Sequence, residues 1–167
     1  MPAQPKIRNI VSTAGTTRDF ISILKRLTGA SPADILAVRL IIEPQAAASV
    51  VSSATGADIK LIREAHENAV NAEDLASFER WDAEFHSCIY AATRNELLIS
   101  LNNLLGDIRN RPPWIRLKKK VITEAKRSEY CGHHEEIVEA IARRDSDGAS
   151  EAMNRHISII IEDLFPR

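Results

Sequence analysis

The sequence predicts an all-α protein that folds as one antiparallel bundle of six to eight helices. Its 167 residues include only six glycines and seven prolines, whereas average usage would give about 20 residues of these two turn-forming types. No segment alternates apolar and polar residues with the period of two that a half-buried strand requires. Between the turn signals, apolar residues recur instead at the spacing of a helix face.

The first residues predict an arm followed by a short helix. Residues 1–15 are polar and carry two prolines, so we expect a flexible N-terminal arm there and a helical domain over residues 16–167. Thr16 and Asp19 have the spacing of a capping box, which predicts a helix that begins there and ends at Gly29.

Stronger start signals divide the rest of the chain. Ser31 precedes a proline at a first helical position, so it should cap a helix that runs to about Thr55. Pro44 lies inside this helix and should bend it or locally break it. Further helices are expected over residues 58–70, 74–92 and 95–111, from about residue 114, over residues 129–144, and from the turn at residues 145–148 to residue 165.

Charge and composition exclude several classes of protein. A formal net charge of −1 provides no general attraction to nucleic acid or to anionic lipid. The longest stretch without a charged residue, residues 44–57, has 14 residues, whereas a membrane span needs about 20 apolar ones. The sequence shows no charged start followed by an apolar run, the pattern typical of a signal peptide. Its two cysteines are too few for a disulfide scaffold. We therefore expect a soluble cytoplasmic protein without a membrane partner.

Polar residues on apolar helix faces predict a site. In the helix expected over residues 74–92, Asp82 lies within the apolar stripe, and His86 lies one turn further along the same face. His134 and His156 lie among apolar neighbours on the faces of the last two helices. A carboxylate in such a position needs a cation or several hydrogen-bond donors.

The spacing of these residues brings them together in the expected bundle. His134 is 11 residues before Asp145 and His156 is 11 residues after it, so each lies roughly 16 Å from the turn of one antiparallel hairpin. A third helix carrying Asp82 and His86 would complete one aspartate and three histidines around a point. This donor set suits one divalent transition metal, Zn²⁺ first and Ni²⁺, Fe²⁺ or Mn²⁺ after it. Taken singly, each residue would also fit a hydrogen-bonded core histidine or a local Asp–His pair.

Three other residues receive weaker interpretations. Cys131 lies one turn before His134 and could replace a ligand, although a small core residue is the simpler interpretation. His133 points about 100° away from His134 and is left out of the site. His66 has no partner in the pattern and is expected at the surface.

Two arginines are candidates for binding a ligand. Arg39 is surrounded by apolar residues on its helix face, which directs its guanidinium into the core. It either pairs with Glu43, four residues later, or binds a ligand carboxylate through two parallel hydrogen bonds. Arg109, at the edge of an apolar stripe, is a candidate of the same kind. Six cations over residues 116–127 predict a solvated helix face, with an anion-binding or DNA-proximal patch as the alternative.

Four motifs carry a family resemblance through their order and spacing: Arg39-Leu-Ile-Ile-Glu43, Asp82-Ala-Glu-Phe85-His86, His134-Glu-Glu-Ile137 and Met153-Asn-Arg-His156. They resemble the FCD domain, the C-terminal effector-binding domain of the FadR branch of GntR-type bacterial transcription regulators, over about residues 17–165. The resemblance implies an antiparallel helical bundle that usually forms a homodimer, and a small carboxylate effector at or beside a metal. By matching motif the metal ligands are Asp82, His86, His134 and His156, the same four residues that helical periodicity selects.

The front of the chain departs from this family. A GntR-type regulator carries a winged helix-turn-helix domain before the FCD domain, whereas only 30 residues precede Ser31 and they show no such pattern. The chain is therefore expected to be an excised or naturally standalone effector domain, which contacts DNA only through a winged domain that it does not contain.

The favoured function is a metal-containing sensor of a small organic acid in a GntR/FadR-type regulator, and not an enzyme. One alternative is a metal-dependent hydrolase, in which the metal activates a water. Against it, no general base is evident near the ligands, since Glu84 lies about 200° around its helix from Asp82. The other alternative is a purely structural metal in a dimerisation module.

Overall fold

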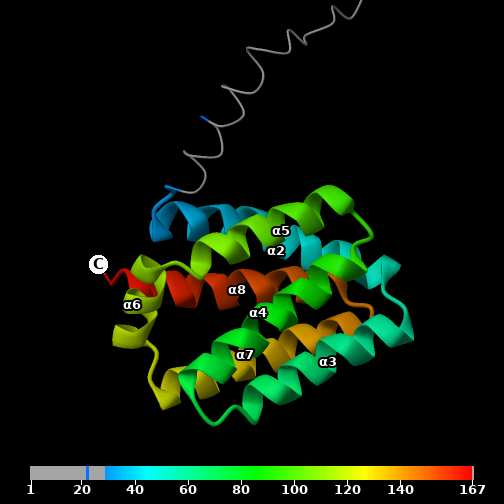
Figure 1. Cartoon of the computed structure of the whole chain (residues 1–167). Helices are drawn as coiled ribbons and strands as arrows, with labels where there is room; N and C mark the ends of the chain where they lie inside the picture. The colour runs from blue at the N-terminus through cyan, green and yellow to red at the C-terminus, as the bar shows by residue number, and fades with distance from the viewer. Residues whose placement is uncertain (1–21, 23–28, 167) are drawn as a thin grey trace, which may run out of the picture. The chain divides into compact units, whose positions relative to one another are not determined.

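The structure, a computed structural model, describes residue 22 and residues 29–166. This part of the chain is built from helices and contains no strand, which confirms the all-α prediction. Its seven full helices are α2 (Pro32–Ser53), α3 (Gly56–Val70), α4 (Leu75–Ala92), α5 (Glu96–Arg109), α6 (Pro112–Val121), α7 (Glu124–Ala142) and α8 (Ser146–Leu164) (Figure 1).

The chain divides into two compact units, residues 1–31 and residues 32–167. All seven helices belong to the second unit. The expected N-terminal arm and nearly all of the helix expected over residues 16–29 lie outside the described residues.

Side-chain caps explain where most of the helices begin. A cap satisfies a backbone N–H of the first turn, which has no partner within its own helix. Five of the described helices follow such a residue, namely Thr55, Asp74, Asn95, Thr123 and Asp145.

The helices pack in pairs that define the core. Helix α8 packs against α2 and α7, and α3 packs against α4 and α7 (Figure 1). Phe78, Phe85, Ile137 and Ile157 are all buried where these helices meet. Each such side chain contributes about 1.5–3 kcal/mol through removal of its apolar surface from water. The functional side chains described below extend from helices of this buried core.

One arginine ties the α7–α8 turn to the end of α2. Arg144 has a positive φ of 61° in this turn. Its guanidinium donates hydrogen bonds to the carbonyl oxygens of Val51, at 2.7 Å, and Ala54, at 2.8 Å. These carbonyls belong to the last turn of α2 and to the residue after it, where cations are favourable. The contact fixes the register of the α7–α8 hairpin against α2.

Two helices differ from the sequence prediction. Helix α2 continues through the buried Pro44, so the local break considered for it does not occur. Helix α7 begins at Glu124 rather than near residue 129, because the Thr123 side chain accepts the N–H of Lys126 and caps an additional turn.

Helix α2 is also the one described helix that is long and apolar enough to cross a membrane by composition alone, with a mean hydropathy of 1.5 over its best window. Half of that window is buried inside the bundle, and the core helix of a soluble protein gives the same signal. Its apolar composition is accounted for by packing.

Candidate metal centre

Four side chains from three helices converge in the core. Asp82 and His86 extend from α4, His134 from α7 and His156 from α8. Each offers one ligand atom within 4.8 Å of the other three, and all four residues are buried. The structure thus brings together the four residues that the sequence selected.

The distances within this cluster suit a small cation. His134 Nε2 lies 3.3 Å from His156 Nε2 and 3.5 Å from Asp82 Oδ1. His86 Nε2 lies 3.9 Å from the same carboxylate oxygen. A tetrahedral ion with bonds of about 2.0–2.2 Å would hold its ligand atoms roughly 3.3–3.6 Å apart. Two of the three distances lie in this range and the third is slightly longer, and the donor set is one that a transition metal accepts.

The environment favours the protonation states that a metal requires. Burial lowers the pKa of His134 to about 3, although the nearby Asp82 carboxylate acts in the opposite direction. Burial also holds the pKa of His156 well below its usual range, with His134 acting in the same direction. Burial opposes ionisation of Asp82, but its electrostatic interactions with His86 and Arg109 hold the pKa of its carboxyl below the usual range. Neutral imidazoles and an ionised carboxylate are the ligand forms that bind a metal.

The ring of Phe85 stacks on the imidazole of His134. Its centroid lies 4.1 Å from that of His134, with 16° between the ring planes. Because both rings are buried, the imidazole is packed against an apolar wall that excludes water from the cluster.

A buried carboxylate that the sequence suggested only as an ion-pair partner lies directly behind His86. Glu43 Oε2 is 2.9 Å from His86 Nδ1, the ring nitrogen further from the cluster. Such carboxylate–histidine contacts orient a metal ligand and raise its basicity. Burial opposes ionisation of Glu43, but Arg39 and His86 hold its pKa below the usual range.

Arg39 is paired with this carboxylate. Its Nε donates to Glu43 Oε1 at 2.5 Å and its Nη2 to Oε2 at 3.2 Å. The Nη2 atom also lies 3.2 Å from His86 Nε2. The buried Arg39–Glu43 pair considered from the sequence is therefore present, and it lies against the cluster.

Arg109 occupies the corresponding position beside the aspartate. Its Nη2 donates to Asp82 Oδ2 at 3.0 Å, while Oδ1 faces His134. The Nε–H of Arg109 is buried without an acceptor among the described residues. Both candidate arginines are thus beside the cluster, and Arg109 keeps one N–H available.

His66 and Cys131 have different positions. His66 is 6% exposed, so its expected surface position is wrong. Its Nε2 lies 2.7 Å from Glu135 Oε2, and its ring centroid is 6.3 Å from that of His134. A signal was present in the sequence, because His66 shares its helix face with the apolar residues Ile62 and Ala69, and this face packs on α7. Cys131 is buried in α7 and is not one of the four converging residues.

The cationic run over residues 116–127 is not wholly a solvated face. Lys118 is 9% exposed and forms an ion pair with Glu79. Its Nζ also lies 5.9 Å from the centroid of the Trp114 ring. Burial lowers the pKa of Lys118 to about 8, and the charge of Arg39 acts in the same direction. Lys118 lies on the same face of α6 as the buried Trp114, and this face packs against the bundle.

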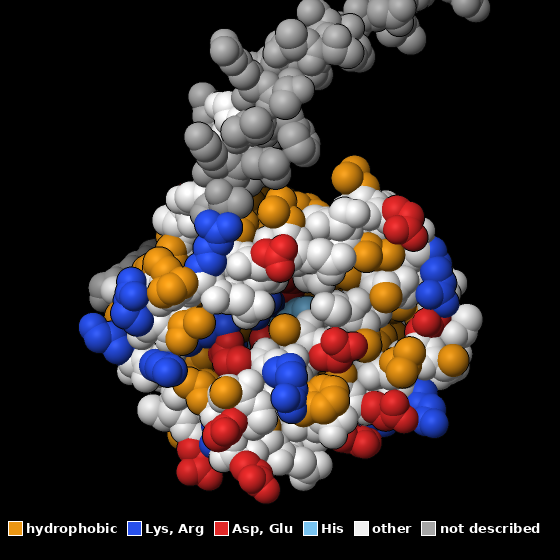
Figure 2. Space-filling view, viewed as in Figure 1, with side chains coloured by type: hydrophobic (Ala, Val, Ile, Leu, Met, Phe, Trp, Pro, Cys, Tyr) orange, Lys and Arg blue, Asp and Glu red, His pale blue; other side chains and the backbone are white. Residues whose placement is uncertain are grey.

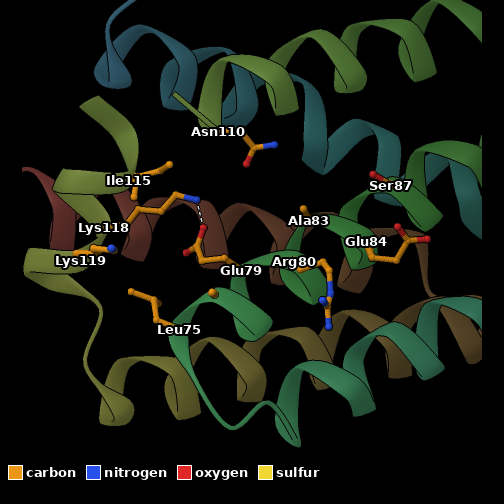
Figure 3. Close-up of a pocket in the computed structure, with 11 residues that line it drawn as sticks. Leu75, Glu79, Arg80, Ala83, Glu84, Ser87, Asn110, Ile115, Lys118 and Lys119 are labelled. Atoms are coloured by element: carbon orange, nitrogen blue, oxygen red, sulfur yellow. Dashed lines mark hydrogen bonds and ion pairs between the residues drawn. The ribbon is translucent and has the colours of Figure 1, made fainter. Parts of the chain in front are cut away.

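One cavity adjoins the cluster, and a larger groove shares two lining residues with that cavity, Glu79 and Lys118. An inner cavity of about 20 Å³ is lined by Arg39, Asp82, Arg109 and Lys118, among others. An outer groove of about 550 Å³ runs between α4 and α6 (Figure 3). Figure 2 shows a hollow on this face, with charged side chains around it and a histidine at its floor.

Comparison with known proteins identifies the fold and its relatives. The family model described as "FCD domain" matches residues 34–158. The chain is 30% identical over 140 residues to the Uxu operon transcriptional regulator of Escherichia coli strain K12, which covers 81% of this chain and 54% of that protein. It is 26% identical over 126 residues to the Exu regulon transcriptional regulator of the same strain, covering 75% and 48%.

Two solved structures share the fold. Streptococcus agalactiae GntR aligns with a TM-score of 0.63 at 23% identity, over 90% of this chain and 65% of that one. Escherichia coli McbR/YncC aligns with a TM-score of 0.71 at 19% identity, over 79% and 63%. The chain spans about half the length of the curated relatives it matches, which are transcriptional regulators. The chain therefore belongs to the FCD domain family of GntR-type transcription regulators.

Proposed function

We propose that the chain is a metal-containing effector-sensing domain that binds a small organic acid and thereby modulates DNA binding by a GntR/FadR-type regulator. The observation that carries this proposal is the buried cluster of Asp82 and three histidines with two arginines beside it. One divalent transition metal would be held there, with Zn²⁺ favoured and Ni²⁺, Fe²⁺ or Mn²⁺ also suited to the donor set.

The chemistry of the site suits a carboxylate. A bound metal is a Lewis acid that attracts an anionic oxygen. Arg39 and Arg109 line the inner cavity beside the cluster, and guanidinium groups bind carboxylates through paired hydrogen bonds. Asp82 and Glu43 neutralise these arginines, which lowers the cost of burying them. An incoming carboxylate would therefore meet the metal and two oriented cations together.

The effector would act on DNA only through the rest of the regulator. In this proposal the domain forms a homodimer in the cytoplasm, and a winged helix-turn-helix domain outside this chain contacts DNA. A ligand can shift an equilibrium between two arrangements only by binding one of them more tightly. We infer that the acid favours one arrangement of the two subunits, and with it one spacing of the DNA-binding heads.

An enzymatic role has less support. A metal-dependent hydrolase needs a general base within hydrogen-bond reach of its water. Glu43, the carboxylate that contacts His86, is already engaged by Arg39 and His86. A structural metal in a dimerisation module is the second candidate, and the small inner cavity of about 20 Å³ favours it. It predicts metal binding without any response to carboxylates.

Calorimetry on zinc-loaded protein tests the proposal. Acetate, butyrate and succinate are titrated into the wild type, Arg39→Ala and His134→Ala, with Arg63→Ala as a control from a partly exposed ion pair. We expect carboxylate binding that is weakened in the first two variants and retained in the control. If Arg39→Ala and His134→Ala both bind carboxylates as the wild type does, the proposed mechanism is wrong.

A further inference from the structure

The inner cavity and the outer groove meet at a single ion pair. Glu79 from α4 and Lys118 from α6 line both the inner cavity and the outer groove. Figure 3 shows the two side chains pointing toward each other, with their interaction drawn between the helices. The pair therefore separates the region of Arg39, Asp82 and Arg109 from the groove that opens to solvent.

The inner cavity is too small for the acid that the proposed function requires. Its volume of about 20 Å³ corresponds to the space of about one water molecule. The groove beyond the ion pair offers about 550 Å³. A carboxylate that reaches the cluster must therefore extend into the groove, and its path crosses the line between Glu79 and Lys118.

Separation of this ion pair is less costly for Glu79 than for Lys118. The Glu79 side chain is 21% exposed, so its carboxylate can be solvated on the groove side. Lys118 is more deeply buried and lies near the Trp114 ring. A buried ammonium without a partner is costly. A ligand that displaces Glu79 is therefore favoured if it brings its own negative charge to Lys118.

Two buried donors at the inner cavity also favour an anionic ligand. Arg109 Nε–H and Trp114 Nε1–H have no acceptor among the described residues, and both residues line this cavity. Unpaired buried donors are unfavourable until an acceptor reaches them. The cavity is thus matched to a ligand rich in acceptor oxygens.

The charges of the residues around the inner cavity support a ligand with two negative charges. The cations Arg39, Arg109 and Lys118 are matched one to one by the carboxylates of Glu43, Asp82 and Glu79. A divalent ion held by neutral imidazoles would add two positive charges to this balanced set. One ligand carboxylate would offset part of this added charge, and a second would replace the negative charge that Glu79 withdraws from Lys118.

We propose that the effector is a dicarboxylate, with one carboxylate at the cluster beside Arg39 and Arg109 and the other replacing Glu79 as the partner of Lys118. This inference rests on the proposed function and adds the chemical class of the ligand. Lys118 is the specificity-determining residue, and the groove between α4 and α6 is the route of entry. Because Lys118 belongs to α6, the ligand links the cluster directly to the position of that helix.

Matched pairs of acids test this proposal on the full zinc-loaded chain. Succinate is compared with butyrate and glutarate with pentanoate by calorimetry, so that each pair differs only in the second carboxylate. We expect at least one dicarboxylate to bind about tenfold or more tightly than its partner, as a largely buried charged hydrogen bond provides. Metal content is measured before and after each titration to exclude stripping of the zinc.

Three variants assign the preference to its residue. Lys118→Met should weaken dicarboxylate binding much more than monocarboxylate binding, so that the affinity ratio within each pair of acids falls to about one. Lys119→Met, which removes the same charge from an exposed position on the same helix and groove, should change neither. Glu79→Gln removes the internal competitor and should raise the ratio of dicarboxylate to monocarboxylate affinity.

The outcomes separate this inference from the proposed function. Equal affinities within both pairs, with binding present, overturn the dicarboxylate proposal and leave carboxylate sensing intact. Absence of binding by all four acids overturns the proposed function and this inference with it. Circular dichroism checks that Lys118→Met is folded. If it is not, Glu79→Gln decides: an unchanged ratio of dicarboxylate to monocarboxylate affinity in that variant overturns the assignment of the preference to Lys118.

Discussion

Replacing Arg39 by methionine should destabilise the fold strongly, because it leaves a carboxylate buried without its main partner. Arg39 and Glu43 are each 2% exposed and are joined by two hydrogen bonds of 2.5 and 3.2 Å. Breaking a buried pair by removing one partner costs about 3–5 kcal/mol. We expect the lower end, about 3 kcal/mol, because His86 Nδ1 lies 2.9 Å from Glu43 and still shares its charge.

Urea unfolding followed by circular dichroism at a helical wavelength measures this loss. The control is Arg63→Met, because the Arg63–Glu139 pair is of similar length, at 2.7 Å, but is partly exposed. That variant should lose no more than about 1 kcal/mol. The double variant Arg39→Met/Glu43→Leu should return to within about 1 kcal/mol of the wild type. If Arg39→Met costs as little as the control, the buried pair contributes no more to stability than the partly exposed one.

Three further predictions concern pH, a helix cap and the metal. The pKa of His134 is about 3 in the fold against 6.5 for the free side chain. As the pH falls, the unfolded state therefore takes up this proton before the folded state does. The free energy of unfolding should decrease below about pH 6.5, by up to about 1.4 kcal/mol per pH unit for this group. Chemical unfolding of metal-free protein at several pH values measures that slope, and His134→Gln should reduce it. A Cβ at Gly148 would lie 2.7 Å from Asp145 Cγ, so Gly148→Ala should displace the α8 cap and cost about 1 kcal/mol in urea unfolding. Glu43→Gln weakens the contact behind His86 and should lower zinc affinity about 10-fold or more in a chelator competition, whereas wild-type affinity would contradict a supporting role.

Much of the cluster could be predicted because helical geometry is local. The period of the helix alone places Asp82 and His86 one turn apart on one face of α4. The equal spacing of His134 and His156 from Asp145 predicts that they face each other, and Asp145 does cap α8 at the turn of the hairpin. Their Nε2 atoms lie 3.3 Å apart in the structure.

The surroundings of the cluster depend on packing between helices, which a single sequence does not encode in any local pattern. Glu43 reaches His86 only because α2 packs beside α4. Lys118 lies within an apparently solvated run of cations, and its burial follows from the way Trp114 anchors α6. A signal for Lys118 was nevertheless present, since it follows Trp114 by four residues and therefore shares its helix face. His66 likewise follows the buried Ile62 by four residues, so its own helix face carried a similar signal.

Metal content per chain tests whether Asp82, His86, His134 and His156 hold a transition metal. The protein is purified without a metal-affinity column and analysed by elemental mass spectrometry, as wild type and as His134→Ala. Cys88→Ala serves as a control for adventitious binding, because that thiol is partly exposed and outside the cluster. We predict about one transition metal ion per chain in the wild type and in Cys88→Ala, as expected for four protein ligands, and its loss in His134→Ala. A wild-type protein that contains no metal and takes up none from a zinc buffer would contradict the claim, and so would a His134→Ala variant that retains the ion.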